Sequence, residues 1–346
     1  MATDPALSLV PRPTPLPLPS VADVVVVAET AQAMHEAVST VIDGKPDVVR
    51  TSLIVLLAQG HLLLEDVPGV GKTMLAKALA ASMDATVRRI QFTPDLLPSD
   101  VTGVSIYNSN SRDFEFKPGA VFSNVLIADE INRASPKTQS ALLECMEEDQ
   151  VTVDGVGYPL RPPFLVVASQ NPVEMEGTYP LPEAQRDRFT ARLTIGYPSP
   201  SAELDMIDSH GAGSPQDDVE PVTTAAEVTQ LIETVRTVHV SDEVRRYVVD
   251  LVTATRRHPD LRLGASPRAT LHLIRTARAA AAIDGRPFVV PDDVQSLASV
   301  VLGHRLLPTA EAQVSRRTPF DVVDELIRRV PLPGMASPTP PSRRGR

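Results

Sequence analysis

The strongest constraint on the fold of this chain is the segment HLLLEDVPGVGKTMLAKALA, which occupies residues 61–80. An apolar run suited to a strand leads into a loop that contains Gly69 and Gly71, and strong helix formers follow from Thr73. The two glycines allow backbone N–H groups to close around a phosphate, and the start of the helix adds partial positive charge. The order of strand, loop and helix therefore predicts a phosphate-binding loop.

The loop also carries the side chains that phosphate chemistry requires. Lys72 is placed to reach the β- and γ-phosphates of a nucleotide, and the Thr73 hydroxyl is placed to bind Mg²⁺. One position departs from the pattern G-x-x-x-x-G-K-[ST], because Asp66 stands where the first glycine is expected. Aspartate tolerates unusual φ values better than most residues, so we expect the turn to survive; the alternative is a glycine-rich helix start without a ligand. The expected nucleotide contacts are Pro68, Gly69, Val70, Gly71, Lys72, Thr73 and Met74.

Two further apolar runs end in polar residues that suit the same chemistry. After the run NVLIA, Asp129 is placed to hold the Mg²⁺ shell and Glu130 to orient and polarise an attacking water. Asn171 follows the run FLVVASQ, and we expect this strand to lie between the loop and the acids, so that Asn171 contacts the γ-phosphate or the water. The alternatives are a solvated strand end for the acids and a simple turn at Asn171-Pro172.

Arginines near the end of this region complete the set of candidates. Phosphoryl transfer gains from an arginine that neutralises developing charge, and a neighbouring subunit often supplies it. In the segment LPEAQRDRFTARL, Arg188 is the first candidate and Arg186 the second. The alternative for Arg188 is a surface ion pair with Asp187 or Glu183. Arg268, in GASPR, is predicted in the first turn of a helix, where the helix dipole does not favour a cation and a phosphate would explain it.

The pattern of apolar residues changes once along the chain. Over residues 23–196 the short runs HLLLED, VRRIQF, NVLIAD and FLVVAS alternate with longer helical patterns, whereas residues 197–330 carry helical patterns alone. Continuous apolar runs separated by helices are typical of a parallel sheet covered on both faces. We therefore expect an α/β nucleotide-binding domain followed by a small all-helical domain. Residues 1–22 and 331–346 are rich in proline and are predicted to be disordered tails.

Composition narrows the class of function. The formal net charge is −10, which gives no electrostatic footprint for nucleic acid. Cys145 is the single cysteine, so no intrachain disulfide can form. No apolar run approaches the roughly 20 residues that span a bilayer, and the start lacks the pattern of a signal peptide, so we expect the cytoplasm. The seven histidines show no chelating spacing, and we expect no metal site built from protein ligands alone.

Five segments, in this order along the chain, resemble the MoxR group of AAA+ ATPases: PGVGKT, LIADEINRASPKTQSALLECMEE, SQNP, LPEAQRDRF and GASPR. The resemblance implies an AAA+ αβα domain with a helical lid, and ATP and Mg²⁺ as ligands. It assigns Walker B to Asp129 and Glu130, sensor 1 to Asn171, the arginine finger to Arg188, sensor 2 to Arg268, and contacts near the adenine to Ile42 and Gly44 in VIDGKP. The family more usually has an apolar residue at the position of Arg186, so which arginine acts stays open.

The resemblance also implies an oligomeric assembly and a function. The stretches QFTPDLLPSDVTGVSIYN and FEFKPGAVF resemble the helix-2 insert of this clade, and Asp154-Gly155 marks a hairpin before sensor 1. Members are implied to form rings, here a hexamer, in which both features face the pore or one ring surface. Because the clade repositions the lid, Arg268 is implied to serve either its own nucleotide or a neighbour's. The implied function is chaperone-like remodelling of partner proteins, frequently ones with a von Willebrand factor A domain.

Three other functions stay open at this point. A nucleic-acid motor is disfavoured by the acidic balance and by the absence of interleaved aromatic and basic residues. A nucleotide-gated scaffold without turnover is disfavoured by the intact Lys72, Asp129 and Glu130. A small-molecule kinase would leave the helical domain and Arg188 unexplained.

Overall fold

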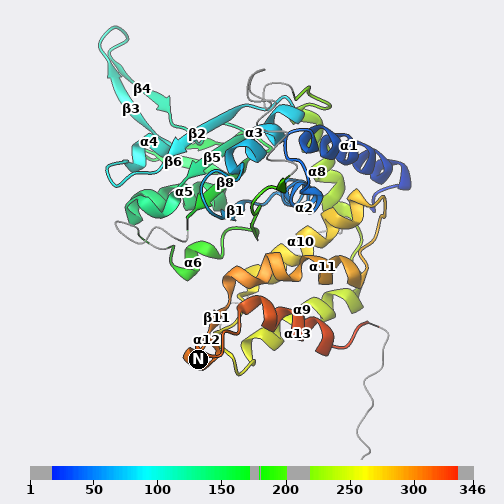
Figure 1. The fold of residues 1–346 in the computed structure, drawn as a ribbon. Helices are drawn as coiled ribbons and strands as arrows, with labels where there is room; N and C mark the ends of the chain where they lie inside the picture. The colour runs from blue at the N-terminus through cyan, green and yellow to red at the C-terminus, as the bar shows by residue number, and fades with distance from the viewer. Residues whose placement is uncertain (1–17, 172–178, 180, 201–218, 334–346) are drawn as a thin grey trace, which may run out of the picture.

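Five parallel strands form the centre of the computed structural model, which describes residues 18–171, 179, 181–200 and 219–333 (Figure 1). Their order is β2-β5-β8-β1-β9, and every neighbouring pair is parallel. The four predicted runs are thus strands of one sheet, and β8 lies between β1 and β5 as expected. The fifth strand, β9, has three residues, too few for a periodic pattern, and the sequence did not predict it. The strands are β1 (Leu62–Glu65), β2 (Val87–Gln91), β5 (Val125–Asp129), β8 (Leu165–Gln170) and β9 (Ala191–Leu193).

The strands bury apolar side chains on both faces of the sheet. In β1, Leu62 and Leu64 belong to one hydrophobic cluster and Leu63 to another, and all three are buried. Successive strand residues point to opposite faces, so each face carries its own cluster. The first cluster joins the sheet to three helices of the α/β domain, and the second joins it to a fourth helix. The helices are α1 (Val21–Ser39), α2 (Pro46–Leu57) and α3 (Lys72–Ser82) for the first, and α5 (Pro136–Glu148) for the second.

Helix α1 begins at Val21, inside the segment 1–22 that was predicted as a disordered tail. Ser20 Oγ accepts a hydrogen bond from the Asp23 N–H at 3.1 Å, and the Asp23 carboxylate accepts one from the Ser20 N–H at 3.0 Å. This capping box satisfies two backbone donors at the helix start, which is why the helix begins earlier than composition indicated. The rest of the predicted tails falls largely on residues 1–17 and 334–346, outside the described part of the chain.

A helical domain follows the sheet and is interrupted by one short ladder. Four of its helices begin at a capping hydroxyl, where the side chains of Thr224, Ser241, Ser266 and Thr318 accept backbone hydrogen bonds. The domain is not purely helical, because β10 pairs antiparallel with β11, and a pairing between distant segments has no local sequence signal. The elements are α8 (Ala225–Thr237), α9 (Asp242–Arg256), β10 (Leu261–Leu263), α10 (Pro267–Ile283), α11 (Pro291–Leu302), β11 (Leu307–Pro308), α12 (Ala310–Val314) and α13 (Pro319–Arg329).

The helical domain shares its core with the sheet. Its buried residues Val228, Leu251 and Leu273 belong to the same hydrophobic cluster as Leu62 and Leu64 of β1. Helix α10 packs against both α1 and α2 (Figure 1). Apolar packing therefore sets the position of the lid relative to the sheet. Among the described residues, none of the helices has the length and hydropathy needed to cross a bilayer.

Two antiparallel hairpins interrupt the α/β pattern. The hairpin of β3 and β4 occupies the stretch that resembles a helix-2 insert and projects from the body of the molecule (Figure 1). The hairpin of β6 and β7 turns at Asp154 and Gly155, whose φ values are 51° and 79°. Positive φ at both central residues matches a type I′ turn, so the predicted hairpin is confirmed. The elements are α4 (Pro98–Thr102), β3 (Gly103–Asn108), β4 (Asp113–Pro118), β6 (Gln150–Val153) and β7 (Val156–Pro159).

We expect Asp293→Ala to lower the free energy of unfolding by about 3 kcal/mol, because it breaks a buried ion pair and a helix cap together. The Asp293 side chain is 5% exposed and accepts hydrogen bonds from Arg286 at 2.6 and 2.8 Å and from the Val290 N–H at 2.8 Å. Asp284 is the matched control, since it also binds Arg286, at 3.0 Å, but is 39% exposed. Asp284→Ala should lower the free energy of unfolding by under about 1 kcal/mol. Urea unfolding measures the loss of unfolding free energy in both variants, and equal losses would contradict the prediction.

Candidate nucleotide-binding site

The carboxyl ends of three parallel strands bring the predicted phosphate-site residues to one edge of the sheet. Lys72 follows β1 across the loop, and Asn171 directly follows β8. Asp129 is the last residue of β5, and Glu130 comes next. Because β8 lies between β1 and β5, all these side chains leave neighbouring strands at the same edge. Burial lowers the pKa of the lysine, the largest effect, while the nearby carboxylates of Asp66, Asp129 and Glu130 raise it.

The loop itself has the backbone shape expected of a phosphate cradle. Gly69 and Gly71 have φ values of +86° and +95°, in the left-handed region that favours glycine. Gly71 caps α3, so the first N–H groups of the helix open onto the loop. Lys72 Nζ folds back and donates to the carbonyl oxygens of Asp66 at 2.5 Å and Val67 at 3.2 Å. A helix start, left-handed glycines and an ammonium group therefore meet at one place.

The residues predicted near the adenine lie beside this loop. Ile42 is buried, and a Cβ at Gly71 would lie 3.8 Å from its Cδ1. Gly44 has a φ of +69°, which accounts for glycine at this position. Both residues line a shallow depression of about 490 Å³ between α1 and α2. An apolar side chain next to the phosphate loop suits the flat face of a base, and the adenine contact stays a prediction.

Asp66 has a different role from the one that the sequence indicated. It is not among the described residues with positive φ, so its tolerance of unusual φ is not used. Instead, its Oδ2 accepts a hydrogen bond from the Gly196 N–H at 2.6 Å, and its Oδ1 accepts one from the Val67 N–H at 2.8 Å. A carboxylate at this position ties the phosphate loop to the chain that follows β9. A glycine has no side chain to make this connection.

Asp129 is nearly buried and has two partners that sequence reasoning did not identify. Its Oδ1 accepts from Ser169 Oγ at 3.2 Å, and its Oδ2 pairs with Arg89 Nε at 2.6 Å. Arg89 lies on β2. An arginine inside a run that otherwise suits a strand could have indicated a charged partner on a neighbouring strand. Asp129 and the Thr73 hydroxyl are hard oxygen donors, which suit Mg²⁺ bound together with substrate phosphates. The residues present therefore fit the metal that the resemblance implies.

Glu130 stands in a strained backbone conformation with φ 57° and ψ 48°. Its N–H donates to Ser169 Oγ at 3.0 Å, and its carboxylate accepts from Gln91 Nε2 at 2.8 Å and pairs with Arg133 Nε at 3.0 Å. A left-handed non-glycine residue costs energy and persists only where its surroundings hold it. Gln91 lies two residues after Arg89, on the same face of β2, so this polar spacing was the signal for both missed residues.

Arg188 and Arg268 lie away from this edge. The Thr190 N–H donates to the His61 carbonyl at 2.8 Å, so the segment before β9 lies beside the start of β1. The phosphate loop follows the other end of β1, whose four residues extend over about 13 Å. Within one chain, the structure therefore does not bring Arg188 to the phosphate loop.

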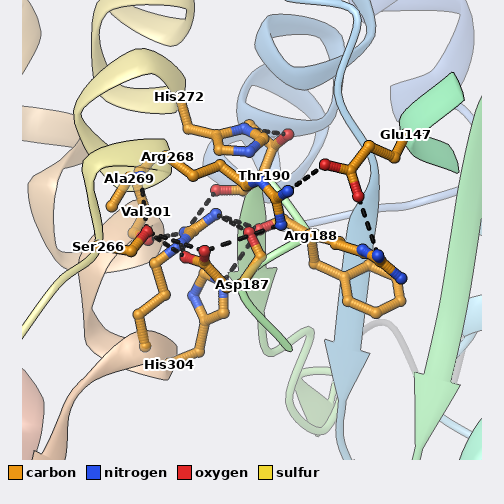
Figure 2. A network of polar contacts seen from close by, with 12 residues as sticks. Glu147, Asp187, Arg188, Thr190, Ser266, Arg268, Ala269, His272, Val301 and His304 are labelled. Atoms are coloured by element: carbon orange, nitrogen blue, oxygen red, sulfur yellow. Dashed lines mark hydrogen bonds and ion pairs between the residues drawn. The ribbon is translucent and has the colours of Figure 1, made fainter. Parts of the chain in front are cut away.

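A single carboxylate brings the two arginines together (Figure 2). At the end of α5, Glu147 Oε2 pairs with Arg188 Nη2 at 2.9 Å, and Glu147 Oε1 pairs with Arg268 Nη2. The ion pair expected as the alternative for Arg188 is thus present with another partner, one distant in sequence that only the fold supplies. Arg186 lies in the short helix α6 (Glu183–Arg186), and its Nε is buried without a hydrogen-bond partner among the described residues.

A buried arginine joins the segment that carries Arg188 to the lid. The Arg305 side chain is 1% exposed and pairs with Asp187 at 2.9 Å. It also donates to the carbonyl oxygens of Asp187, Phe189 and Thr190 at 3.1, 2.5 and 3.2 Å. Burial lowers the pKa of Arg305 to about 10, against the opposing effect of Asp187, so the guanidinium stays charged at neutral pH. Sequence reasoning missed Arg305, because nothing local marks an arginine that becomes buried.

Known protein families match both parts of the chain. Residues 61–191 match the family described as "ATPase family associated with various cellular activities (AAA)". Residues 253–326 match the AAA lid domain. The first match begins before β1 and ends at the start of β9, and the second covers most of the helical domain.

Individual relatives extend the similarity over nearly the whole chain. The uncharacterized protein YeaC of Bacillus subtilis is 50% identical over 298 residues, which span 86% of this chain and 93% of YeaC. Chaperone MoxR1 of Mycobacterium tuberculosis is 42% identical over 305 residues, 86% of this chain and 80% of MoxR1. The solved structure of a candidate ATPase from Cytophaga hutchinsonii has a TM-score of 0.83 and 38% identity, and covers 90% of this chain and 97% of that protein.

We expect Lys72→Ala to abolish ATP binding, whereas Glu130→Gln should bind ATP and hydrolyse it at under about 1% of the normal rate. The reason is that Lys72 is placed to contact phosphate in the ground state, while Glu130 is placed to act chiefly on the water in the transition state. Equilibrium dialysis and phosphate release measure the two steps, with Lys77→Ala in the same helix as the control. Near-normal turnover in the Glu130 variant would contradict its role.

Proposed function

The chain belongs to the MoxR family of AAA+ ATPases, and we propose that it works as a ring-forming ATPase that remodels or matures partner proteins in a chaperone-like way. The observation that carries this proposal is the separation of the Lys72 edge of the sheet from the edge that holds Arg188 and Arg268. The packed strand β1 lies between the two edges, so one chain alone has no complete site. In a closed ring, one edge of each subunit faces the other edge of its neighbour.

Nucleotide binding uses the loop edge of one subunit. The N–H groups at the start of α3 and the Lys72 ammonium bind the phosphates, and Lys72 exchanges its carbonyl contacts for phosphate oxygens. Mg²⁺ held by Thr73 and Asp129 would neutralise charge on the β- and γ-phosphates. Ile42 packs beside the adenine, next to Gly44.

Hydrolysis uses both edges. Glu130 orients and polarises a water whose oxygen attacks the γ-phosphorus while the bond to the β–γ bridging oxygen breaks. Asn171, at the end of the adjacent strand, helps to place the water or the γ-phosphate. Arg188 and Arg268 of the neighbouring subunit neutralise the charge that develops on the phosphoryl group. The shared contact with Glu147 supports a common direction for the two arginines, so we place both in trans.

Partner proteins are proposed to meet the projecting β3–β4 hairpin. Val104, Ile106, Tyr107 and Phe114 are large apolar residues on this hairpin, and their exposures run from 44% to 68%. Exposed apolar groups that gather on one feature mark surfaces for protein contacts. We propose a hexameric ring in the cytoplasm and partners that include von Willebrand factor A domain proteins. Pull-down under ATP with the Glu130→Gln variant, which holds nucleotide without turnover, tests which partners bind.

We expect the Arg188→Ala variant to bind ATP normally, and its rate of ATP turnover to fall by a factor of roughly 10³ or more. The decisive experiment mixes this variant with Lys72→Ala. The first keeps an intact loop and the second an intact arginine edge, so mixed rings contain some complete sites. The combined phosphate release should exceed the sum of the two separate preparations.

Two further measurements make the mixing experiment conclusive. Native mass spectrometry establishes that mixed rings form, and Arg236→Ala, which removes an exposed arginine on helix α8 that contacts neither Arg188 nor Glu147, serves as the control. If mixed rings form and no activity returns, Arg188 does not act in trans. Arg186→Ala then takes its place in the same pairing with Lys72→Ala.

A further inference from the structure

The two arginines away from the phosphate loop share one partner whose role the reaction scheme above leaves open (Figure 2). Glu147 Oε2 lies 2.9 Å from Arg188 Nη2, and Glu147 Oε1 accepts from Arg268 Nη2. Each oxygen therefore holds a different guanidinium, one from the segment before β9 and one from the lid. The side chains of Arg188 and Arg268 are 28% and 35% exposed, so an incoming anion can reach both guanidiniums.

Asp187, the other acid in this network, is occupied elsewhere. Its carboxylate pairs with the buried Arg305 at 2.9 Å and accepts from Ser266 Oγ at 2.8 Å. Arg268 Nη1 comes no closer to it than 3.9 Å. Asp187 thus fastens the backbone of its segment to the lid, whereas Glu147 holds the charged ends of the two arginines.

The charges of the cluster do not cancel. Arg305 balances Asp187, and Glu147 offsets one of the two positive charges of Arg188 and Arg268. Two guanidiniums repel each other at short range, and a carboxylate between them lowers that repulsion. Each guanidinium has five N–H donors, and the contact with Glu147 uses one nitrogen of each. Net positive charge and further donors therefore remain for a phosphate.

We propose that Glu147 is a positioning residue that pairs Arg188 with Arg268, so that both guanidiniums meet the same phosphate of the adjacent subunit's nucleotide. This inference rests on the proposed function, because it requires the arginine edge to act in trans. Glu147 works through the arginines and makes no contact with the nucleotide. Guanidinium donors that are already ordered before the phosphate arrives lower the barrier to phosphoryl transfer, because the reaction step does not have to order them.

The substitution Glu147→Gln removes the charge and keeps the size of the side chain. ATP affinity at the variant's own loop should be unchanged, and turnover should fall about ten- to hundredfold, less than for Arg188→Ala. Glu148→Gln is the matched control, since it makes the same change of charge on the next, exposed residue of α5. The control should turn over like the unmodified protein. Unchanged turnover in Glu147→Gln would overturn the proposal.

Mixed rings locate the defect on one edge of the subunit. When Glu147→Gln is mixed with Lys72→Ala, the phosphate release should exceed the sum of the two separate preparations. The reason is that an intact loop of one subunit then meets an intact arginine edge of its neighbour. Glu147→Gln mixed with Arg188→Ala should show no such gain, because both variants are defective on the same edge. A gain in the second mixture, or none in the first, would overturn the positioning role.

The pair Arg188→Ala and Lys72→Ala separates this inference from the proposed function. If that pair gains activity while the Glu147 mixtures fail, the composite site stands and the role of Glu147 is wrong. If that pair gains nothing in mixed rings, the composite site is wrong and the inference falls with it. Glu147→Asp guards against a packing effect, since it restores the charge on a shorter side chain and should recover part of the turnover. An Asp variant no better than Gln would assign Glu147 to packing instead.

Discussion

All five strands of the sheet run in the same direction, and this common direction divides the chemistry of the molecule between two edges. The candidate residues that follow β1, β5 and β8, including Lys72, Glu130 and Asn171, lie together at the carboxyl ends of these strands. The segment that precedes β9, with Arg188, lies beside the start of β1. Because β1 separates the two edges within one chain, the proposed site takes one set of residues from each of two subunits.

The lid is coupled to the arginine edge by polar groups and to the sheet by apolar ones. Arg305 binds Asp187 and three carbonyl oxygens of the chain around Arg188, and these partners replace the water that burial removes from its guanidinium. The hydrophobic cluster that holds β1 continues into the lid helices. The contacts of Arg305 hold the lid against the segment that carries Arg188, which places Arg268 beside Arg188 and away from the chain's own phosphate loop.

Several partners of the predicted residues are visible only once the chain is folded. Gln91 and Arg133 restrain the Glu130 carboxylate, and Arg89 neutralises Asp129. The arginine and glutamine on β2 had a weak local signal, because polar residues two apart on a strand share a face. Asp66 shows the opposite case, in which the sequence identified an unusual residue but the physical reason for it came from a hydrogen bond to Gly196.

Local patterns were sufficient for the four main strands, the Asp154-Gly155 hairpin and the gathering of Lys72, Asp129 and Glu130, because strand period and turn chemistry act within a few residues. The strand β9, the β10–β11 ladder and the partners of Arg188, Arg268 and Arg305 were decided by tertiary structure alone. Each depends on contacts between segments far apart in the chain, and an isolated arginine or three-residue strand has no pattern of its own. The sequence thus determined which residues are candidates for the phosphate chemistry, and the fold decided on which edge of the sheet each of them stands.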